Sequence, residues 1–107
     1  MEETTWGEFA TIFGATPRNR ILEFFLETRE LDFSIGDVAK ETGLNRATTY
    51  NTMEELLASG LIKATRKVSG GQLYQLHTDK KEVKVLIEMF NLLLDKIAEK
   101  HKEKIIA

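Results

Sequence analysis

The feature that most constrains the fold is residues 36–77, where two short helical patterns are separated by one glycine and followed by a glycine-centred hairpin. Gly43 ends the first pattern, and glycine readily adopts the left-handed conformation that turns a chain sharply after a helix. Asn45 then suits the N-cap of the second helix. Ser69-Gly70-Gly71 lies between two strand-like runs and predicts a hairpin turn. The second helix is therefore expected at the surface, with the hairpin beside it.

Capping patterns and apolar spacing predict the remaining elements. Thr5 with Glu8, Ser34 with Asp37, and Asp79 with Glu82 each have the spacing of a capping box, in which two side chains satisfy the first backbone amides of a helix. The predicted elements are helices beginning near Thr5, Thr16, Ser34, Asn45 and Asp79, a short strand at Phe33, and strands over 61–68 and 72–77. The fold class is mostly α with a small β-hairpin, an α+β arrangement.

Length and composition limit the function classes. A chain of 107 residues forms one domain with a modest core. The absence of cysteine excludes disulfides and thiolate metal sites. No apolar run reaches the roughly 20 residues that span a bilayer, and the acidic start of the chain lacks the features of a signal peptide. We therefore expect a cytoplasmic protein that does not contact a membrane.

Charge is unevenly distributed along the chain. Residues 1–42 carry 4 basic and 9 acidic side chains, a net charge of −5. Residues 43–77 carry 4 basic and 2 acidic side chains, a net charge of +2, and residues 78–107 carry 7 basic and 6 acidic, a net charge of +1. Because the local patch governs contact with phosphates, the overall charge of −2 does not exclude a nucleic-acid partner. The weak patch predicts modest, salt-sensitive affinity.

The motifs from Arg18 to Leu76 resemble the winged helix-turn-helix of ArsR- and MarR-like transcriptional regulators of bacteria and archaea. The matching residues are Ile35, Val38-Ala39, Gly43-Leu44-Asn45-Arg46-Ala47-Thr48, Met53, Leu56-Leu57, Gly60-Leu61-Ile62 and Tyr74-x-Leu76. Thr49 departs from the aliphatic residue usual in the family. The resemblance implies one domain over 1–107, with a winged core at 15–78 and flanking helices in 1–14 and 79–107. It also implies a sequence-specific regulator that binds double-stranded DNA.

The second helix of such a motif presents its first turns to the major groove, where the four base pairs display distinct donors and acceptors. With Thr49, Met53 and Leu56 directed inward, the residues predicted to contact DNA are Asn45, Arg46, Ala47, Thr48, Tyr50 and Asn51. Asn51 is the candidate base-reading residue because its amide can pair bidentately with adenine. The alternative is an ordinary solvated helix face on which Asn45 is only a cap.

The hairpin supplies a second group of candidates. The residues predicted to approach phosphates or the minor groove are Arg66, Lys67, Ser69, Gly70, Gly71 and Gln72. The alternative for this group is a charged hairpin tip with no ligand. In the second strand, Tyr74 and Leu76 alternate with polar residues, which predicts one buried face.

The last helical pattern predicts a homodimer. Its apolar positions 83, 86, 90, 93 and 97 follow the spacing of a coiled-coil seam. The residues assigned to the dimer contact are Trp6, Phe9, Phe13, Val83, Leu86, Ile87, Phe90, Leu93, Leu94 and Ile97. A dimer would place two recognition helices about 34 Å apart and require a palindromic site. The alternative is a helix that packs only on its own domain.

Catalysis and metal binding find little support in the sequence. We find no nucleophile motif, no phosphate-binding glycine loop and no carboxylate pair beside a histidine. His77 and His101 are far apart, and the acidic residues near His101 do not have metal-ligand spacing. We expect no enzyme activity, no cofactor and no metal, and the sequence identifies no small-molecule effector. A competing hypothesis is a winged-helix module that binds another protein in a transcription or replication assembly.

Overall fold

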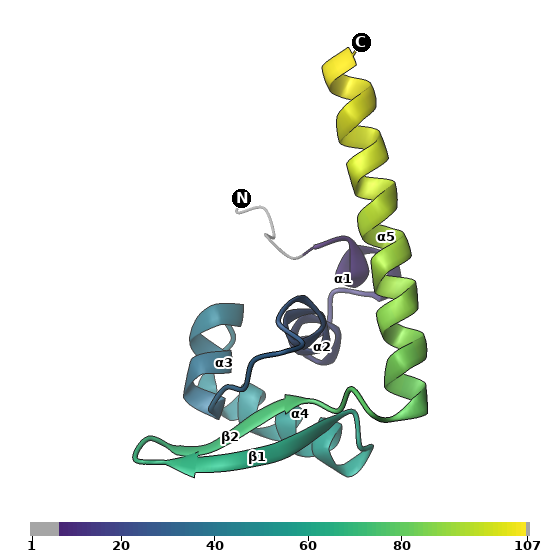
Figure 1. Cartoon of the computed structure of the whole chain (residues 1–107). Helices are drawn as coiled ribbons and strands as arrows, with labels where there is room; N and C mark the ends of the chain where they lie inside the picture. The colour runs from purple at the N-terminus through teal and green to yellow at the C-terminus, as the bar shows by residue number, and fades with distance from the viewer. Residues whose placement is uncertain (1–6, 107) are drawn as a thin grey trace.

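The computed structural model describes the backbone of residues 7–106 and the side chains of residues 7–95. Its elements are α1 (Glu8–Phe13), α2 (Pro17–Glu27), α3 (Ile35–Thr42), α4 (Arg46–Ala58), β1 (Ile62–Val68), β2 (Gly71–Leu76) and α5 (Lys81–Ile106). Figure 1 shows α2 and α3 above the hairpin and α4 behind it, with α5 rising from the end of β2 and extending beyond the other helices. The predicted fold class is therefore confirmed.

Local signals begin and end the central helices as predicted. Thr16 accepts a hydrogen bond from the Asn19 amide at the start of α2, and Pro17 occupies the first helical position, where its missing N–H has no helical partner to lose. Ser34 and Asp37 form the full capping box of α3. Gly43 ends α3 with a φ of 75°, a conformation in which glycine avoids the steric cost of a side chain.

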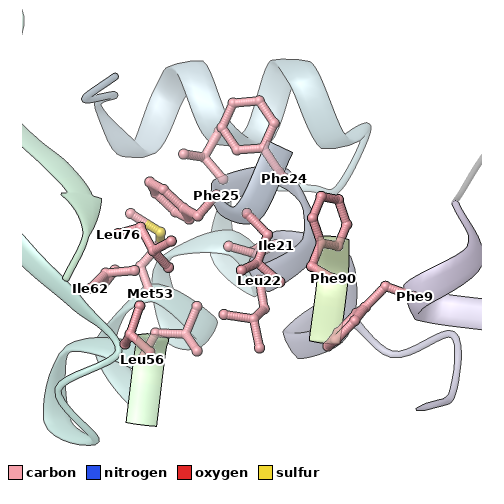
Figure 2. Close-up of a cluster of buried hydrophobic side chains, with 13 residues drawn as sticks. Phe9, Ile21, Leu22, Phe24, Phe25, Met53, Leu56, Ile62, Leu76 and Phe90 are labelled. Atoms are coloured by element: carbon pink, nitrogen blue, oxygen red, sulfur yellow. The ribbon is translucent and has the colours of Figure 1, made fainter. Parts of the chain in front are cut away.

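The core is built around α2. Ile21, Phe25 and Leu26 are fully buried. They pack in one cluster with Met53, Leu56, Ile62 and Leu76 from α4 and the hairpin, and with Phe9, Val83 and Phe90 from α1 and α5. In Figure 2 the α4 and hairpin side chains lie at one end of this cluster, while Phe9 and Phe90 lie at the other. One hydrophobic core thus joins the helix-turn-helix to both ends of the described chain.

The hairpin differs from the prediction at its turn. Gly71 pairs with Val68 and belongs to β2, so the turn consists of Ser69 and Gly70 alone. The register shifts between Ala64 and Lys67, because two β1 residues face one β2 residue. Such a bulge bends the strand and increases its twist.

The predicted burial of β2 is wrong in part. Leu76 is buried, but Tyr74 is only half-buried, and Leu73, one residue out of phase, is also buried. The reason is a third segment: Phe33 exchanges two backbone hydrogen bonds of 2.8 Å with Tyr74. The neighbouring Asp32 accepts hydrogen bonds from Thr65 and Arg66 of β1, so this segment contacts both strands of the hairpin.

Two predicted capping boxes are also wrong. Helix α1 begins at Glu8 with Gly7 as its N-cap, and Thr5 lies outside the described residues. Its first amides donate instead to Glu23 of α2, from Gly7 N to Oε1 at 2.9 Å and from Phe9 N to Oε2 at 3.1 Å. Helix α5 begins at Lys81, two residues after Asp79, whose carboxylate lies 3.9 Å from the Lys63 ammonium.

Among the described residues, no helix is both long and apolar enough to cross a membrane. The same part of the chain holds no group of three or more histidine, aspartate or glutamate side chains arranged to bind a metal ion.

Candidate nucleic-acid interface

Helix α4 has one side fixed in the core and one side free. Thr49, Met53 and Leu56 are completely buried, as predicted, and Thr52 is buried as well. The hydroxyl of Thr49 donates to the Asn45 carbonyl at 2.8 Å. The polar group therefore has a partner although it occupies a core position. The inward side is anchored along three turns, which holds the outward side in a defined orientation.

The outward side of α4 is open to solvent. Ala47 and Asn51 are exposed, Tyr50 is 52% exposed and Thr48 is half-buried. Within the described chain the side-chain amide of Asn51 takes part in no hydrogen bond. Both N–H donors of this group and its carbonyl acceptor are therefore available to a ligand. The small Ala47 lies one turn earlier on the same side and leaves space for close approach.

Asn45 is both exposed and engaged. Its Oδ1 accepts a hydrogen bond of 2.7 Å from the Thr48 amide, which caps α4. The cap uses the side-chain carbonyl, so the amide nitrogen of Asn45 keeps its two donors. The predicted capping role is confirmed, and a contact through the nitrogen stays a prediction.

A small cavity of about 230 Å³ separates the start of α4 from the hairpin. Its lining combines the first residues of α3, Arg46 of α4, and the hairpin residues Gly70, Gly71, Gln72 and Tyr74. The Arg46 guanidinium lies so close to Gly36 that a Cβ there would be 3.3 Å from Nη1. Arg46 thus places a positive charge in the cavity between the start of α4 and the hairpin.

The predicted hairpin residues divide into two sets. Lys67, Ser69, Gly70 and Gly71 are exposed at or near the tip. Gln72 is half-buried, and its Nε2 donates to the carbonyls of Arg66 and Leu73 at 3.0 Å each, across the bulge. The donors of Gln72 are therefore committed to the shape of the hairpin.

Arg66 is held by a residue that the sequence analysis missed. Its Nε and Nη2 donate to the two carboxylate oxygens of Asp32 at 3.1 and 3.3 Å, and Thr65 adds a hydrogen bond of 2.7 Å to Asp32. The hydrogen bonds from Arg66, followed by the one from Thr65, lower the pKa of Asp32. Asp32 lies 34 residues before Arg66, and no local pattern could have indicated the pair.

The residues assigned to the dimer contact are distributed over three environments. Phe9, Val83 and Phe90 belong to the core of this chain, with exposed fractions of 4% or less. Leu86, Ile87 and Leu93 are half-buried, while Phe13 and Leu94 are close to half exposed. Trp6 and the side chain of Ile97 lie outside the described residues.

Other apolar side chains on α1 and α5 are exposed about as much as the most exposed assigned residue, Phe13, or more. Ile12 is 48% exposed, Val85 is 61% exposed and Leu92 is 68% exposed. The sequence analysis missed Val85 and Leu92 because only the periodic stripe of α5 was assigned to the dimer contact, and both residues lie outside it. The structure instead uses Val83 and Phe90 of that stripe to attach α5 to its own core.

This arrangement defines the class: the chain has the winged helix-turn-helix fold, with α3 and α4 as the helix pair and the β1–β2 hairpin as the wing. A sequence model of the IclR helix-turn-helix domain matches residues 20–66. A comparison with curated protein sequences gives no significant match.

Solved structures share the fold. The homodimeric winged helix-turn-helix DNA-binding domain of a possible ArsR-family transcriptional regulator from Mycobacterium bovis has a TM-score of 0.56 at 24% identity, covering 79% of this chain and 73% of that one. HlyU from Vibrio cholerae gives 0.58 at 24%, covering 74% and 80%. The adhesin competence repressor from Streptococcus pyogenes gives 0.62 at 11%, covering 79% and 63%. The resemblance to winged helix-turn-helix transcriptional regulators is therefore confirmed at the level of the fold.

Proposed function

We propose that this protein is a transcriptional regulator that binds double-stranded DNA sequence-specifically as a homodimer. The observation that supports this function best is the exposed side of α4, where Asn51 and Ala47 are free while Thr49, Met53 and Leu56 hold the helix in the core. An exposed helix of this kind fits the major groove, whose base edges are distinguishable by hydrogen bonding. The relatives with this fold that are described as DNA-binding or regulatory support the same function.

In this proposal the side chains have separate roles. Asn51 reads a base through its amide, and Ala47 permits close approach next to it. Arg46 in the cavity between α4 and the wing and the exposed Lys67 of β1 supply positive charge that contacts backbone phosphates. Arg66 contributes less than its charge suggests, because Asp32 neutralises it. The small number of free cations predicts modest affinity that falls with salt.

The homodimer is proposed to form through α1 and α5. Figure 1 shows the far half of α5 projecting beyond the other described helices and the hairpin. Among the side chains of these two helices that the structure describes, Phe13, Leu94, Ile12, Val85 and Leu92 are large apolar ones that the single chain leaves substantially exposed. The Mycobacterium bovis domain with the same fold is homodimeric. Two copies related by a two-fold axis would bind a palindromic site.

Selection of bound fragments from a random DNA pool, at low salt, tests the function. We expect an enriched inverted repeat, which would establish the ligand class and the dimer together. Because DNA is the proposed ligand, we place the protein in the cytoplasm and assign it no catalytic role.

The Asn51→Ala variant tests the recognition helix. It should weaken binding to the selected site by roughly 1–3 kcal/mol, the cost of one good base contact. Lys84→Ala, an exposed change on α5, is the control and should bind normally. Failure of the folded wild type to retain any DNA would refute the proposal. Indifference to Asn51→Ala would favour the alternative of a protein-binding module.

A further inference from the structure

The loop between β2 and α5 is held by polar contacts to the loop between α4 and β1 and to the start of β1. The amide of His77 donates to the Leu61 carbonyl at 2.9 Å, and the Asp79 carboxylate lies 3.9 Å from the Lys63 ammonium. The shortest link to α4 itself comes from Lys80, whose Nζ donates to the carbonyl of Ser59 at 2.9 Å. Ser59 is the C-cap residue of α4. The residue immediately before α5 thus contacts the C-cap residue of the recognition helix.

The position of Lys80 in the chain is electrostatically unfavourable for a cation. Its backbone carbonyl accepts the first helical hydrogen bond of α5, from Lys84, so Lys80 lies at the N-terminal end of that helix. A cation is unfavourable there, because helix N-termini carry partial positive charge. The end of α4 carries the opposite partial charge and unpaired carbonyl groups, which favour a cation. Glu82, 3.8 Å from the ammonium, offsets the remaining repulsion.

Gly60 shows how closely the two segments approach. Its φ of 75° already favours glycine, and a Cβ at this position would collide with the Lys80 ammonium. Gly43 has the same φ, but the space around its missing Cβ is open. Gly60, after the C-cap of α4, therefore leaves room for the Lys80 side chain as well as making the turn.

We propose that Lys80 is a positioning residue that fixes the angle between the recognition helix α4 and the dimer helix α5. This inference rests on the proposed function, because α5 relates two recognition helices only in a dimer. Its consequence is a specificity for spacing: the dimer prefers half-sites at one separation, near one helical turn of DNA. Loss of the ammonium leaves each half-site contact intact and loosens the choice of separation.

The angle can be measured without DNA. The chain has no cysteine, so Glu54→Cys on α4 and Lys84→Cys on α5 provide unique spin-label sites, both exposed. Labelled chains diluted with unlabelled protein report the distance within one subunit. We expect Lys80→Met, which keeps the aliphatic stem, to broaden or shift the distance distribution. The matched control is Lys81→Met, at the adjacent exposed position, and it should leave the distribution unchanged.

The second measurement uses inverted repeats built from the selected half-site, with the spacer lengthened or shortened by one base pair. For Lys80→Met, the penalty for the wrong spacer should fall by about threefold, in the range expected for the loss of one hydrogen bond. The affinity for an isolated half-site should not change. Lys80→Arg, which retains a cationic donor, should restore part of the preference.

An unchanged distance distribution, or an unchanged spacer preference despite a changed distribution, overturns the inference. Equal effects of Lys80→Met and Lys81→Met also overturn it. They would show that the loss of any positive charge at the start of α5 is responsible, and not the loss of the contact between Lys80 and Ser59. If the wild type binds no DNA, the proposed function fails and the spacing role fails with it. The spin-label distances then still decide whether Lys80 fixes the two helices.

Discussion

The helix-turn-helix and the two flanking helices begin in different ways, although their sequences look alike. Helices α3 and α4 are capped by neighbouring side chains, Ser34 with Asp37 and Asn45, within three residues of the amides they satisfy. Helix α1 is capped by Glu23 from another helix. At the start of α5, Lys80 turns away to contact Ser59. A capping pattern therefore predicts a helix start only where no distant side chain competes for the same position.

The largest expected effect concerns the distant cap. Glu23 is 2% exposed and accepts hydrogen bonds from two amides of the α1 end. Glu23→Ala removes both acceptors and should lower the free energy of unfolding by about 3 kcal/mol, because buried donors without partners are costly. Urea denaturation measures this loss, with the exposed Glu30→Ala as control. If Asn45→Ala, which removes the local cap of α4, costs as much, the distant cap of α1 is not the stronger of the two.

The next effect separates two glycines with the same φ of 75°. Gly43→Ala should cost roughly 1–2 kcal/mol of stability through the left-handed backbone alone. Gly60→Ala should cost more, because the new Cβ also displaces the Lys80 ammonium. In the double variant with Lys80→Ala, the cost of Gly60→Ala should approach that of Gly43→Ala. Thermal or urea unfolding of these variants measures the difference, and equal costs in the wild-type background would contradict it.

A smaller effect is expected at the local cap of α4. Asn45→Ala removes the acceptor for the Thr48 amide and should destabilise the protein by about 1 kcal/mol. Asn45→Asp keeps the acceptor and should unfold at nearly the wild-type urea concentration. If the aspartate variant is as unstable as the alanine variant, the side chain of Asn45 has a role other than capping.

The smallest effect concerns pH and the wing. Pairing with Arg66 lowers the pKa of Asp32 in the folded state below its value of about 4 in the unfolded chain. The pair therefore stabilises the fold above pH ~4, and this contribution disappears as the pH falls through the lower folded value. Asp32→Asn should be less stable than the wild type at neutral pH and should converge with it at acidic pH in urea titrations. A difference that persists in acid would show that hydrogen bonding, not charge, holds the wing.

Much of the fold could be predicted from the sequence because the central signals are local. The caps of α2, α3 and α4, the turn at Gly43 and the buried positions Thr49 and Met53 each depend on residues a few positions apart. The exposed side of α4 followed from the same spacing. The turn of the hairpin was misplaced by one residue, because Gly71 pairs with Val68 in the sheet instead of lying in the loop.

The rest of the candidate site depends on contacts between distant residues. Asp32 meets Arg66 only because Phe33 joins the wing as a third segment. Phe9, Val83 and Phe90 were assigned to the dimer contact because a periodic apolar stripe does not show which partner covers it. Their burial in the core leaves Val85 and Leu92, which were not assigned, as the most exposed apolar side chains in the described part of α5.

The sequence by itself determined where the helix-turn-helix lies, how its two helices begin, and which side of α4 faces outward, since helical spacing and capping act over three or four residues. The tertiary structure alone decided which side chains hold the outer elements in place. These are Glu23 at the start of α1, Lys80 between α4 and α5, and Asp32 at the wing. Each of these contacts joins residues more than ten positions apart, so its energy depends on a chain that has already folded.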